Sequence, residues 1–513
     1  MIKKCHFILA LLILASCKSH VTENKTKDNR PNIIFILSDD HAYQAISAYG
    51  YGLNHTPNID ELAKEGMLFN RAFVNNSLCA PSRAAILTGK YSNLNGIKGN
   101  GDEVFDGTQN TFPKLLRQAG YQTAMIGKWH LVSNPTGFDF WNILPGQGDY
   151  YNPRFIDSNG TKSVEGYITD LTMDKAINWL NSRDATRPFC ALVWNKAPHR
   201  DWMPAIKYLH EFDSVNIPLP ATFFDNYSTR TRAVKEQKME ISKWLAPNYD
   251  LKENFDVDSP YQRLDDAWKN IFNRLNPEER KAFIAAYTPK NNAFKKANLK
   301  GRDLAIWKYE RYVKDYLRTI QSVDDNVGRL MNYLKEKGLD KNTIVIYSSD
   351  QGFYLGEHGW FDKRFMYEQS FRTPLIVRWP EVITPGSTSN AMVMNLDIAE
   401  TLLDAAHVKI PTEMQGKSML PVWGGKTPDD WRKYVYYHYY ESAGEHNVAK
   451  HVGIRSDRYK LIYYYENKDW ELYDLKNDSS ELHNIYNNPA YRKNRDSLKT
   501  ELQLQMKKYK DGI

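Results

Sequence analysis

Four stretches of the chain are almost continuously hydrophobic over the length of a strand. They are PNIIFIL at 31–37, PFCALVW at 188–194, NTIVIYS at 342–348 and TPLIVRW at 373–379. Hydrophobic runs without polar alternation are typical of parallel strands that are covered on both faces. This pattern therefore predicts a sheet whose central strands are fully buried.

Amphipathic segments lie between these runs. Segments 56–66, 111–120 and 312–338 combine helical spacing of apolar residues with a closing glycine, which commonly ends a helix. Strands that alternate with helices indicate an α/β fold. We therefore expect a mixed, mainly parallel sheet sandwiched by helices.

The periodicity changes twice along the chain. It weakens over 203–300, which we interpret as an insertion lying over the sheet within a first domain at 31–385. After residue 385 the chain predicts short strands with turns at 451–475 and a closing helix at 488–510. We expect 386–513 to form a smaller antiparallel α+β domain.

The amino terminus has the pattern of an export signal. Two lysines precede a short apolar run, which predicts a signal peptide at 1–16 rather than a membrane-spanning helix. The sequence L-A-S-C at 14–17 resembles the lipobox of bacterial lipoproteins, which implies that Cys17 is acylated and that 17–30 is a tether. The expected location is an exported, membrane-anchored lipoprotein, periplasmic or on the cell surface; the alternative is plain cleavage at a small residue.

Charge and cysteine content limit the partners and the kinds of scaffold that the chain can have. The net charge of +7 is spread along 513 residues without a basic block, so we expect no nucleic-acid partner. Of four cysteines, Cys5 leaves with the signal, Cys17 is the lipid site, and Cys190 lies in a predicted buried strand. Two thiols are too few for a disulfide scaffold. Cys79, in a turn ahead of a predicted helix, needs another explanation.

Acidic residues follow two of the predicted strands directly. Asp39 and Asp40 follow one, and Asp350 and Gln351 follow another. The carboxyl ends of strands in such sheets border the ligand crevice, so these side chains are expected to converge there. A single aspartate here is commonly a cap or turn residue, but this all-oxygen set suits Ca²⁺ or Mg²⁺. A Cys79 thiolate does not belong among such ligands.

The sequence around Cys79 resembles a known family. C-A-P-S-R at 79–83, followed by A-A-I-L-T-G-K-Y, closely resembles the signature of type I sulfatases, which have an alkaline-phosphatase-like fold. The resemblance implies that a maturase, the formylglycine-generating enzyme, oxidises Cys79 to formylglycine, whose hydrate offers oxygen to calcium. It extends over about 30–480 through NIIFILSDD, GYQTAMIGKWHL, NKAPHRDW and SSDQGFYLGEHGWFDKR. The implied calcium ligands are Asp39, Asp40, residue 79, Asp350 and Gln351, where the family more often has Asn or His at the last position.

The resemblance also implies catalytic roles. Arg83, Lys128 and Lys363 would stabilise the negative charge that grows on the sulfate as its ester bond breaks. One hydroxyl of the hydrate would attack sulfur while His199 protonates the leaving sugar oxygen. His130 would then take the proton of the second hydroxyl, so that the aldehyde re-forms and sulfate leaves. Outside these motifs, Lys128 would be read as a solvated lysine and His130 as a packing residue.

The stretch 359–380, GWFDKRFMYEQSFRTPLIVRWP, is similar to N-acetylglucosamine-6-sulfatases, including those that act on mucin and heparan fragments. This similarity implies that Asp362 and Arg364 flank Lys363 on the sugar side, with a surface ion pair as the alternative. His451 is a weaker candidate, with His438 and His446 as competitors. The expected substrates are 6-O-sulfates of N-acetylglucosamine or N-sulfoglucosamine in host glycans.

Other functions remain open from the sequence. Within the class, the substrate could be a galactosamine-6-sulfate or a uronate 2-sulfate. A phosphonate or phosphate-monoester hydrolase of the same superfamily is a more distant alternative. A catalytically inactive glycan-binding lipoprotein is disfavoured, because all the catalytic residues that the resemblance implies are present. They are Cys79, Arg83, Lys128, His130, His199 and Lys363.

Overall fold

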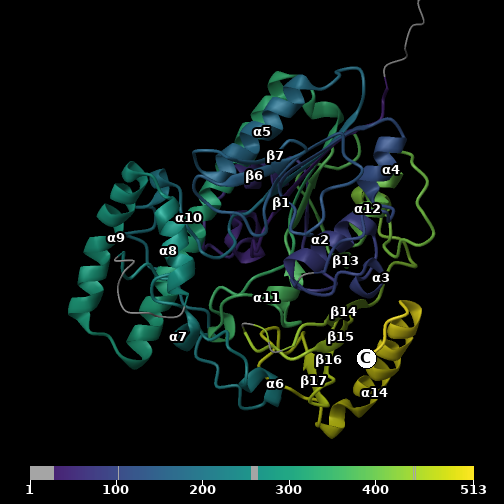
Figure 1. Ribbon diagram of the computed structural model, residues 1–513. Helices are drawn as coiled ribbons and strands as arrows, with labels where there is room; N and C mark the ends of the chain where they lie inside the picture. Colours follow the sequence, from purple (N-terminus) through teal and green to yellow (C-terminus); the bar gives the residue numbers. More distant parts are fainter. Residues whose placement is uncertain (1–27, 102, 256–263, 443, 445) are drawn as a thin grey trace, which may run out of the picture.

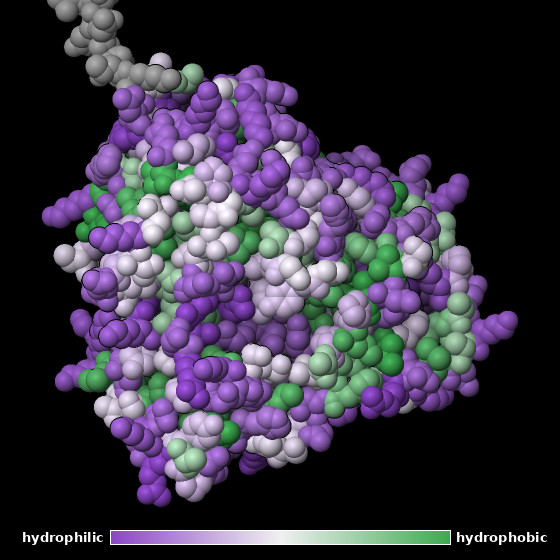
Figure 2. Space-filling model, turned by 180° about the vertical axis from the view of Figure 1, so that it is seen from behind, coloured by the Kyte–Doolittle hydropathy of each residue, from purple (hydrophilic) through white to green (hydrophobic). Residues whose placement is uncertain are grey.

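The computed structural model describes residues 28–101, 103–255, 264–442, 444 and 446–513. The predicted signal peptide and Cys17 lie outside the described residues, as does most of the predicted tether at 17–30. Within the described residues, no helix is both long and apolar enough to cross a membrane. Hydrophilic side chains dominate the face in Figure 2, and the green patches gather mainly where α8 and α9 lie in this reversed view.

A sheet of ten strands forms the centre of the molecule (Figure 1), in the order β12-β2-β11-β9-β1-β8-β4-β5-β6-β7. The five strands from β9 to β5 are parallel, whereas β11 and β6 run antiparallel to their inner neighbours. The strands are β1 (Asn32–Ser38), β2 (Met67–Phe69), β4 (Gln122–Lys128), β5 (Phe140–Leu144), β6 (Arg154–Asp157), β7 (Gly160–Ser163), β8 (Phe189–Asn195), β9 (Thr343–Ser349), β11 (Leu375–Arg378) and β12 (Ser387–Ser389). The predicted mixed, mainly parallel sheet is confirmed.

Helices cover both faces of this sheet because β1 points apolar side chains to each side. Phe35 packs into one core with α2 (Cys79–Thr88), α4 (Phe112–Gln118) and α12 (Asp397–Ala405). Ile34 and Ile36 pack into the other core with α1 (Pro57–Lys64), α5 (Ile168–Ser182) and α10 (Gly301–Glu336). These β1 residues are fully buried, which explains the unbroken apolar run in the sequence.

The insertion predicted at 203–300 contains α6 (Arg232–Lys235), α7 (Ile241–Trp244), α8 (Asp265–Arg274) and α9 (Pro277–Ala297). Helices α8 and α9 lie beside α10 (Figure 1), so they cover the helix layer rather than the sheet itself. Helix α10 also begins eleven residues before the predicted start at 312, since Ala305 and Tyr309 of its first turns are buried against the insertion.

The carboxy-terminal unit is an antiparallel sheet of β14 (Val435–Tyr439), β15 (His451–Arg455), β16 (Tyr459–Tyr464) and β17 (Asp469–Asp474), with α14 (Arg492–Lys508) packed on it. The predicted boundary at 385/386 is wrong. Strand β12 joins the ten-stranded sheet beside β2, and α12 packs into its core, so the antiparallel unit begins only at β14. The change of pattern after residue 385 coincides with β12, the edge strand of the large sheet, and not with the end of the domain.

The remaining elements are small. Strands β3 (Ala72–Phe73), β10 (Arg372–Thr373) and β13 (Val393–Met394) form a three-stranded sheet between the two larger sheets. Short helices are α3 (Ser92–Asn95), α11 (Glu368–Phe371) and α13 (Leu420–Trp423). After β9, the chain runs through α11 and β10 and returns to the large sheet as β11. Glu368 of α11 pairs with Arg455 and Lys460 of the carboxy-terminal unit, which lies beside α11 (Figure 1).

Gly127 fixes the position of the last residue of β4. Its φ of 98° lies in the left-handed region, and an added Cβ would lie 2.1 Å from the carbonyl oxygen of Trp194 on the neighbouring strand. Only glycine meets both conditions without strain. The backbone at this point therefore delivers the Lys128 side chain to the carboxyl edge of the sheet.

We predict that Gly127→Ala lowers the free energy of unfolding by about 3 kcal/mol, because it combines a strained φ with a backbone clash. Activity assays and thermal unfolding should show a lower Tm together with lost turnover. Gly424→Ala is the matched control, since its Cβ would meet only ordinary contacts at 3.5 Å or more. Equal Tm values for the two variants would contradict this account of Gly127.

Candidate active site

The candidate site lies at the carboxyl ends of the central parallel strands. Asp39 and Asp40 follow β1, Asp350 and Gln351 follow β9, and Lys128 is the last residue of β4. Because β1 pairs with β9 in a register that aligns Ser38 with Ser349, the residues after both strands meet. The convergence predicted from the sequence is confirmed.

The backbone after β1 is held in an unusual conformation. Asp40 has a φ of 62°, and its N–H donates to Asp350 Oδ1 at 3.0 Å. Tyr316 of α10 donates its hydroxyl to the Asp40 carbonyl at 2.6 Å and accepts from the Ala42 N–H at 2.7 Å. These bonds hold the turn so that both aspartate side chains face the same small volume.

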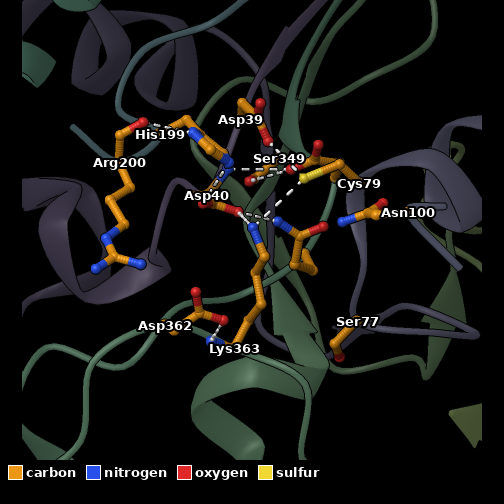
Figure 3. Close-up of polar contacts among 12 residues, drawn as sticks. Asp39, Asp40, Ser77, Cys79, Asn100, His199, Arg200, Ser349, Asp362 and Lys363 are labelled. Atoms are coloured by element: carbon orange, nitrogen blue, oxygen red, sulfur yellow. Dashed lines mark hydrogen bonds and ion pairs between the residues drawn. The ribbon is translucent and has the colours of Figure 1, made fainter. Parts of the chain in front are cut away.

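Cys79 begins α2 and points into this volume (Figure 3). Its thiol donates to Asp39 Oδ1 at 3.1 Å and accepts from Lys363 Nζ at 3.4 Å. The side chain is fully buried, and this burial raises the pKa of the thiol well above its usual value. An unmodified Cys79 is therefore neutral at physiological pH and is a poor nucleophile.

Each buried carboxylate has a buried cation beside it. Arg83 donates through Nε and Nη2 to Asp350 Oδ2 at 3.0 and 2.9 Å. Lys363 Nζ lies 2.5 Å from Asp40 Oδ1, and Lys128 forms an ion pair with Asp39. All six side chains are at most 3% exposed, so their charges act on one another with little screening by water.

These neighbours shift the pKa values in opposite directions. Burial raises the pKa of Asp40 to about 7, although Lys363 acts against it. Burial also opposes ionisation of Asp350, but Arg83 and Lys128 lower the pKa of that carboxyl below its usual value. Burial lowers the pKa of Lys128, whereas Asp40 and Cys79 raise that of Lys363 despite its burial. The two lysines thus differ in how firmly they hold a proton.

Two histidines complete the polar lining. The ring of His199 donates from Nδ1 to the Arg200 carbonyl at 2.6 Å, and its Nε2 lies 3.7 Å from Asp40 Oδ2. His130 has a buried Nδ1 without a hydrogen-bond partner among the described residues. Burial and the nearby Lys128 lower the pKa of both rings, so both are neutral unless further negative charge enters the site.

The oxygen atoms of this site fit a hard divalent cation. Ligand atoms of Asp39, Asp40 and Asp350 lie within 4.8 Å of one another. Gln351 donates its amide N–H to Asp40, but its buried Oε1 has no partner among the described residues. That orphaned oxygen and three carboxylates form the set that Ca²⁺ or Mg²⁺ prefers. The Cys79 sulfur, which also points here, is the one ligand atom that does not fit.

A second group of charges flanks Lys363. Asp362 Oδ1 accepts from Arg364 Nε at 3.2 Å, and its Oδ2 lies 3.1 Å from His446 Nε2. Arg364 also donates to Glu441 Oε2 at 3.0 Å and to the Tyr439 hydroxyl at 3.3 Å. His446 and Arg364 lower the pKa of Asp362 well below its usual value in spite of burial. Asp362 is therefore ionised throughout the ordinary pH range.

The backbone carries strain at this group. Asp362 and Arg364 have φ values of 74° and 93°, which are rare for residues with a side chain. Such strain persists only where surrounding contacts enforce it, and it is concentrated at functional sites. The strained triplet places the Lys363 amine at the carboxylates (Figure 3). Its two neighbours contact the carboxy-terminal unit, Asp362 through His446 and Arg364 through Glu441.

Comparison with protein families identifies this site. Residues 31–408 match the sulfatase family, and residues 356–508 match the carboxy-terminal domain of N-sulphoglucosamine sulphohydrolase. The chain belongs to the sulfatase family. It is a sulfuric ester hydrolase with the alkaline-phosphatase-like fold that the sequence predicted.

Three relatives of this sulfatase are especially informative. The N-acetylglucosamine-6-O-sulfatase of Bacteroides thetaiotaomicron is 49% identical, over 98% of this chain and 90% of the relative. Human N-acetylglucosamine-6-sulfatase is 29% identical, over 85% of this chain and 72% of the relative. The solved structure of BT4656 in complex with its substrate D-glucosamine-2-N,6-O-disulfate superposes with a TM-score of 0.91 at 48% identity, covering 94% of this chain and 98% of that one.

In this sulfatase, His451 lies in an aromatic core instead of contacting Asp362 or Arg364. His451 is fully buried, with its ring stacked against Tyr437 and Tyr439, and burial lowers its pKa to about 3. His438 pairs with Asp511 at 2.8 Å instead. Of the three candidate histidines, His446 is the one that contacts Asp362. An apolar strand such as β15 buries its first residue, and that favours a packed histidine over an exposed one.

Some site residues have no recognisable sequence signal. Glu441 connects the site to another loop, because it accepts from the Asn100 N–H at 2.5 Å while it pairs with Arg364. Asn100 in turn accepts from the Ala80 N–H at 3.0 Å, next to Cys79 (Figure 3). Both residues lie in irregular segments without a motif, so only the folded chain brings them to the site.

Proposed function

We propose that this sulfatase hydrolyses 6-O-sulfate esters of N-acetylglucosamine or N-sulfoglucosamine in host glycans such as heparan fragments or mucin. The observation that carries the proposal is the charged group Asp362–Lys363–Arg364, in which the lysine amine enters the catalytic centre and its neighbours stand beside it. The relative that is 49% identical bears the name N-acetylglucosamine-6-O-sulfatase, and BT4656 was solved with a glucosamine 6-sulfate as its substrate.

The cations of the site suit a sulfate ester. Arg83, Lys128 and Lys363 are already held in place by carboxylates, so they need no reorganisation when negative charge grows on the sulfate oxygens. Their burial strengthens each interaction, because little water screens it. An ester with one negative charge is thus bound more tightly as it approaches its transition state.

The two histidines carry protons at defined atoms. His199 keeps its Nδ1 proton on the Arg200 carbonyl, which leaves Nε2 as the atom that gives a proton to the departing sugar oxygen. The bound sulfate ester adds negative charge near this ring and so raises the low pKa of His199 toward the working range. His130 is neutral and its Nδ1 has no hydrogen-bond partner among the described residues, so this ring is poised to accept a proton.

The proposal also includes a calcium ion and a modified residue, formylglycine, at position 79. Ca²⁺ held by Asp39, Asp40, Asp350 and Gln351 would add Lewis-acid stabilisation of the sulfate oxygens. Conversion of Cys79 to formylglycine by a maturase would supply a hydrated aldehyde, with one hydroxyl for attack on sulfur and a second for release of sulfate. The buried, neutral thiol and the oxygen-rich surroundings of its sulfur both support this change.

The location remains a proposal from the sequence. The L-A-S-C stretch supports acylation of Cys17 and export as a membrane-anchored lipoprotein, periplasmic or on the cell surface. The full chain should partition into membranes, and Cys17→Ala should be soluble. Equal membrane partition of the two proteins would contradict acylation of Cys17.

We predict that glucosamine 6-sulfates, N-acetylated or N-sulfated, are hydrolysed far faster than their galacto epimers. Asp362 and Arg364 offer charged hydrogen-bond partners to the ring hydroxyls, and inverting O4 removes one such hydrogen bond at a cost of about 1.5–3 kcal/mol. Arg364→Ala should lower kcat/KM by about a hundredfold or more. Sulfate release from defined monosaccharides is the measurement.

Arg458→Ala is the matched control for this series, because Arg458 forms an ion pair with Asp474 in the carboxy-terminal unit, and neither residue contacts the site. It should keep the full rate on the gluco substrate. Similar rates on gluco and galacto 6-sulfates would show that the triplet does not recognise the sugar.

We predict that Cys79→Ser abolishes turnover while folding and substrate binding persist, because serine keeps the size of the side chain but offers one hydroxyl only. Mass spectrometry of active protein should find residue 79 lighter than cysteine, as an aldehyde or its hydrate. Cys190→Ala, which changes the other described cysteine, should remain active. Active protein with an intact thiol at position 79 would refute the mechanism.

We predict that chelation removes activity and that Ca²⁺ restores it better than Zn²⁺, because the site offers hard oxygen ligands. Asp350→Ala should lose bound calcium and activity together, as measured by metal analysis of the purified protein and by sulfate release. Full activity of protein shown to contain no metal would rule out the calcium site.

A further inference from the structure

A second polar cavity lies where four parts of the chain meet. It has a volume of about 420 Å³, within the range of small-molecule sites. We name it the accessory cavity. Its walls come from the loop after β1, from the insertion, from the segment around α11 and from the carboxy-terminal unit, and they include Tyr43, Gln44, Tyr51, Gln369, Arg372 and Ser480. None of these six residues belongs to the active site described above.

Arg372 adds a positive charge to this cavity, whose wall also holds the carboxylates of Glu357 and Glu368. Among the described residues, its guanidinium makes no hydrogen bond and no ion pair; it lies over the Tyr43 ring, 4.1 Å from the centroid. Arg455, on the same wall, is by contrast paired with Glu368 at 3.2 Å. A guanidinium stacked on an aromatic face keeps its N–H edge available for a planar anion such as a carboxylate.

Two amide oxygens in the wall lack donors. Gln44 is 2% exposed and donates its N–H to Glu357 Oε1 at 3.0 Å, but its Oε1 has no partner within the described part of the chain. The buried Oε1 of Gln369 is equally unpaired there. Buried acceptors without donors are costly, so a ligand with hydroxyl groups would be favoured at this position.

Tyrosines supply the apolar part of the wall. The rings of Tyr43 and Tyr51 meet edge to face with centroids 5.5 Å apart, and Tyr51 is 50% exposed. Such rings offer a flat apolar surface together with a polar hydroxyl. Sugar rings present a matching combination of C–H faces and hydroxyl edges.

We propose that the accessory cavity binds a uronate, that is, a carboxylate-bearing pyranose, of the glycan on which the active site acts. Arg372 binds the carboxylate, Gln44 and Gln369 accept from ring hydroxyls, and Tyr51 packs on the ring. The identity of the ligand as part of the substrate chain rests on the proposed function; the binding chemistry does not. A second contact on the same glycan raises the local concentration of sulfated ends at the active site.

The test uses the full chain as Cys79→Ser, so that no turnover occurs, and an unsulfated disaccharide of a uronate and N-acetylglucosamine. Calorimetry should detect binding that saturating D-glucosamine-2-N,6-O-disulfate does not displace. Arg372→Gln should weaken this binding at least tenfold. Arg302→Gln is the matched control, because Arg302 is exposed and stacks on Phe224 at 3.6 Å in the same way, away from the cavity. It should bind as tightly as the parent.

A second variant and two further ligands distinguish loss of the binding site from misfolding and identify the group that binds. Tyr51→Ala changes an exposed side chain and should also weaken binding. The carboxyl-reduced disaccharide and inorganic sulfate should not bind. Equal affinity for either of them, displacement by the monosaccharide substrate, or unchanged binding in both variants would overturn the proposal.

The active site is tested separately, by hydrolysis of monosaccharide 6-sulfates. This test uses the protein without the Cys79→Ser substitution. Arg372→Gln should hydrolyse these monosaccharides at the parental rate. Absence of that hydrolysis in the parent would refute the proposed function while leaving the disaccharide result intact. Reduced monosaccharide hydrolysis in Arg372→Gln would instead show that Arg372 supports the active site, and it would overturn a separate cavity.

Discussion

The pairing of three buried carboxylates with three buried cations is the constraint on which the site depends. Charges removed from water are stable only where opposite charges and hydrogen bonds replace the solvent. The parallel sheet provides this geometry, because adjacent β1 and β9 end at the same level and bring Asp40 against Asp350. Arg83 from α2 then binds Asp350 in two hydrogen bonds, so the helix that carries Cys79 is fixed to the sheet by the charges themselves.

The carboxy-terminal unit extends this charge network toward the sugar. Lys363 pairs with Asp40 inside the centre, and Arg364 pairs outward with Glu441, which follows β14. One strained segment thus connects catalytic charge to the surface that would meet the substrate. Glu441 also accepts from the loop at Asn100, which itself bonds to the start of α2. Under the proposed function, sulfate recognition and sugar recognition would therefore be parts of one continuous network.

The sequence predicted where the acidic residues converge better than it predicted where the carboxy-terminal unit begins. Asp39, Asp40, Asp350 and Gln351 could be placed because buried strands have a clear pattern and a strand's end fixes where the next side chains lie. The boundary at 385 failed because β12 is a three-residue edge strand, too short for any periodicity. The sequence offered His451 as a weaker candidate with His438 and His446 as competitors, and aromatic packing around β15 buries His451.

The sequence by itself determined the alternation of buried strands with helices, the family and the acidic residues that follow β1 and β9. Those features depend on local patterns and on contiguous motifs, which folding does not alter. Only the tertiary structure decided which side chains from separate regions meet: Glu441 with Arg364, His446 with Asp362, and Arg372 with the Tyr43 ring. Pairing of this kind depends on distances across the fold, and residues dozens of positions apart carry no sign of it in their order along the chain.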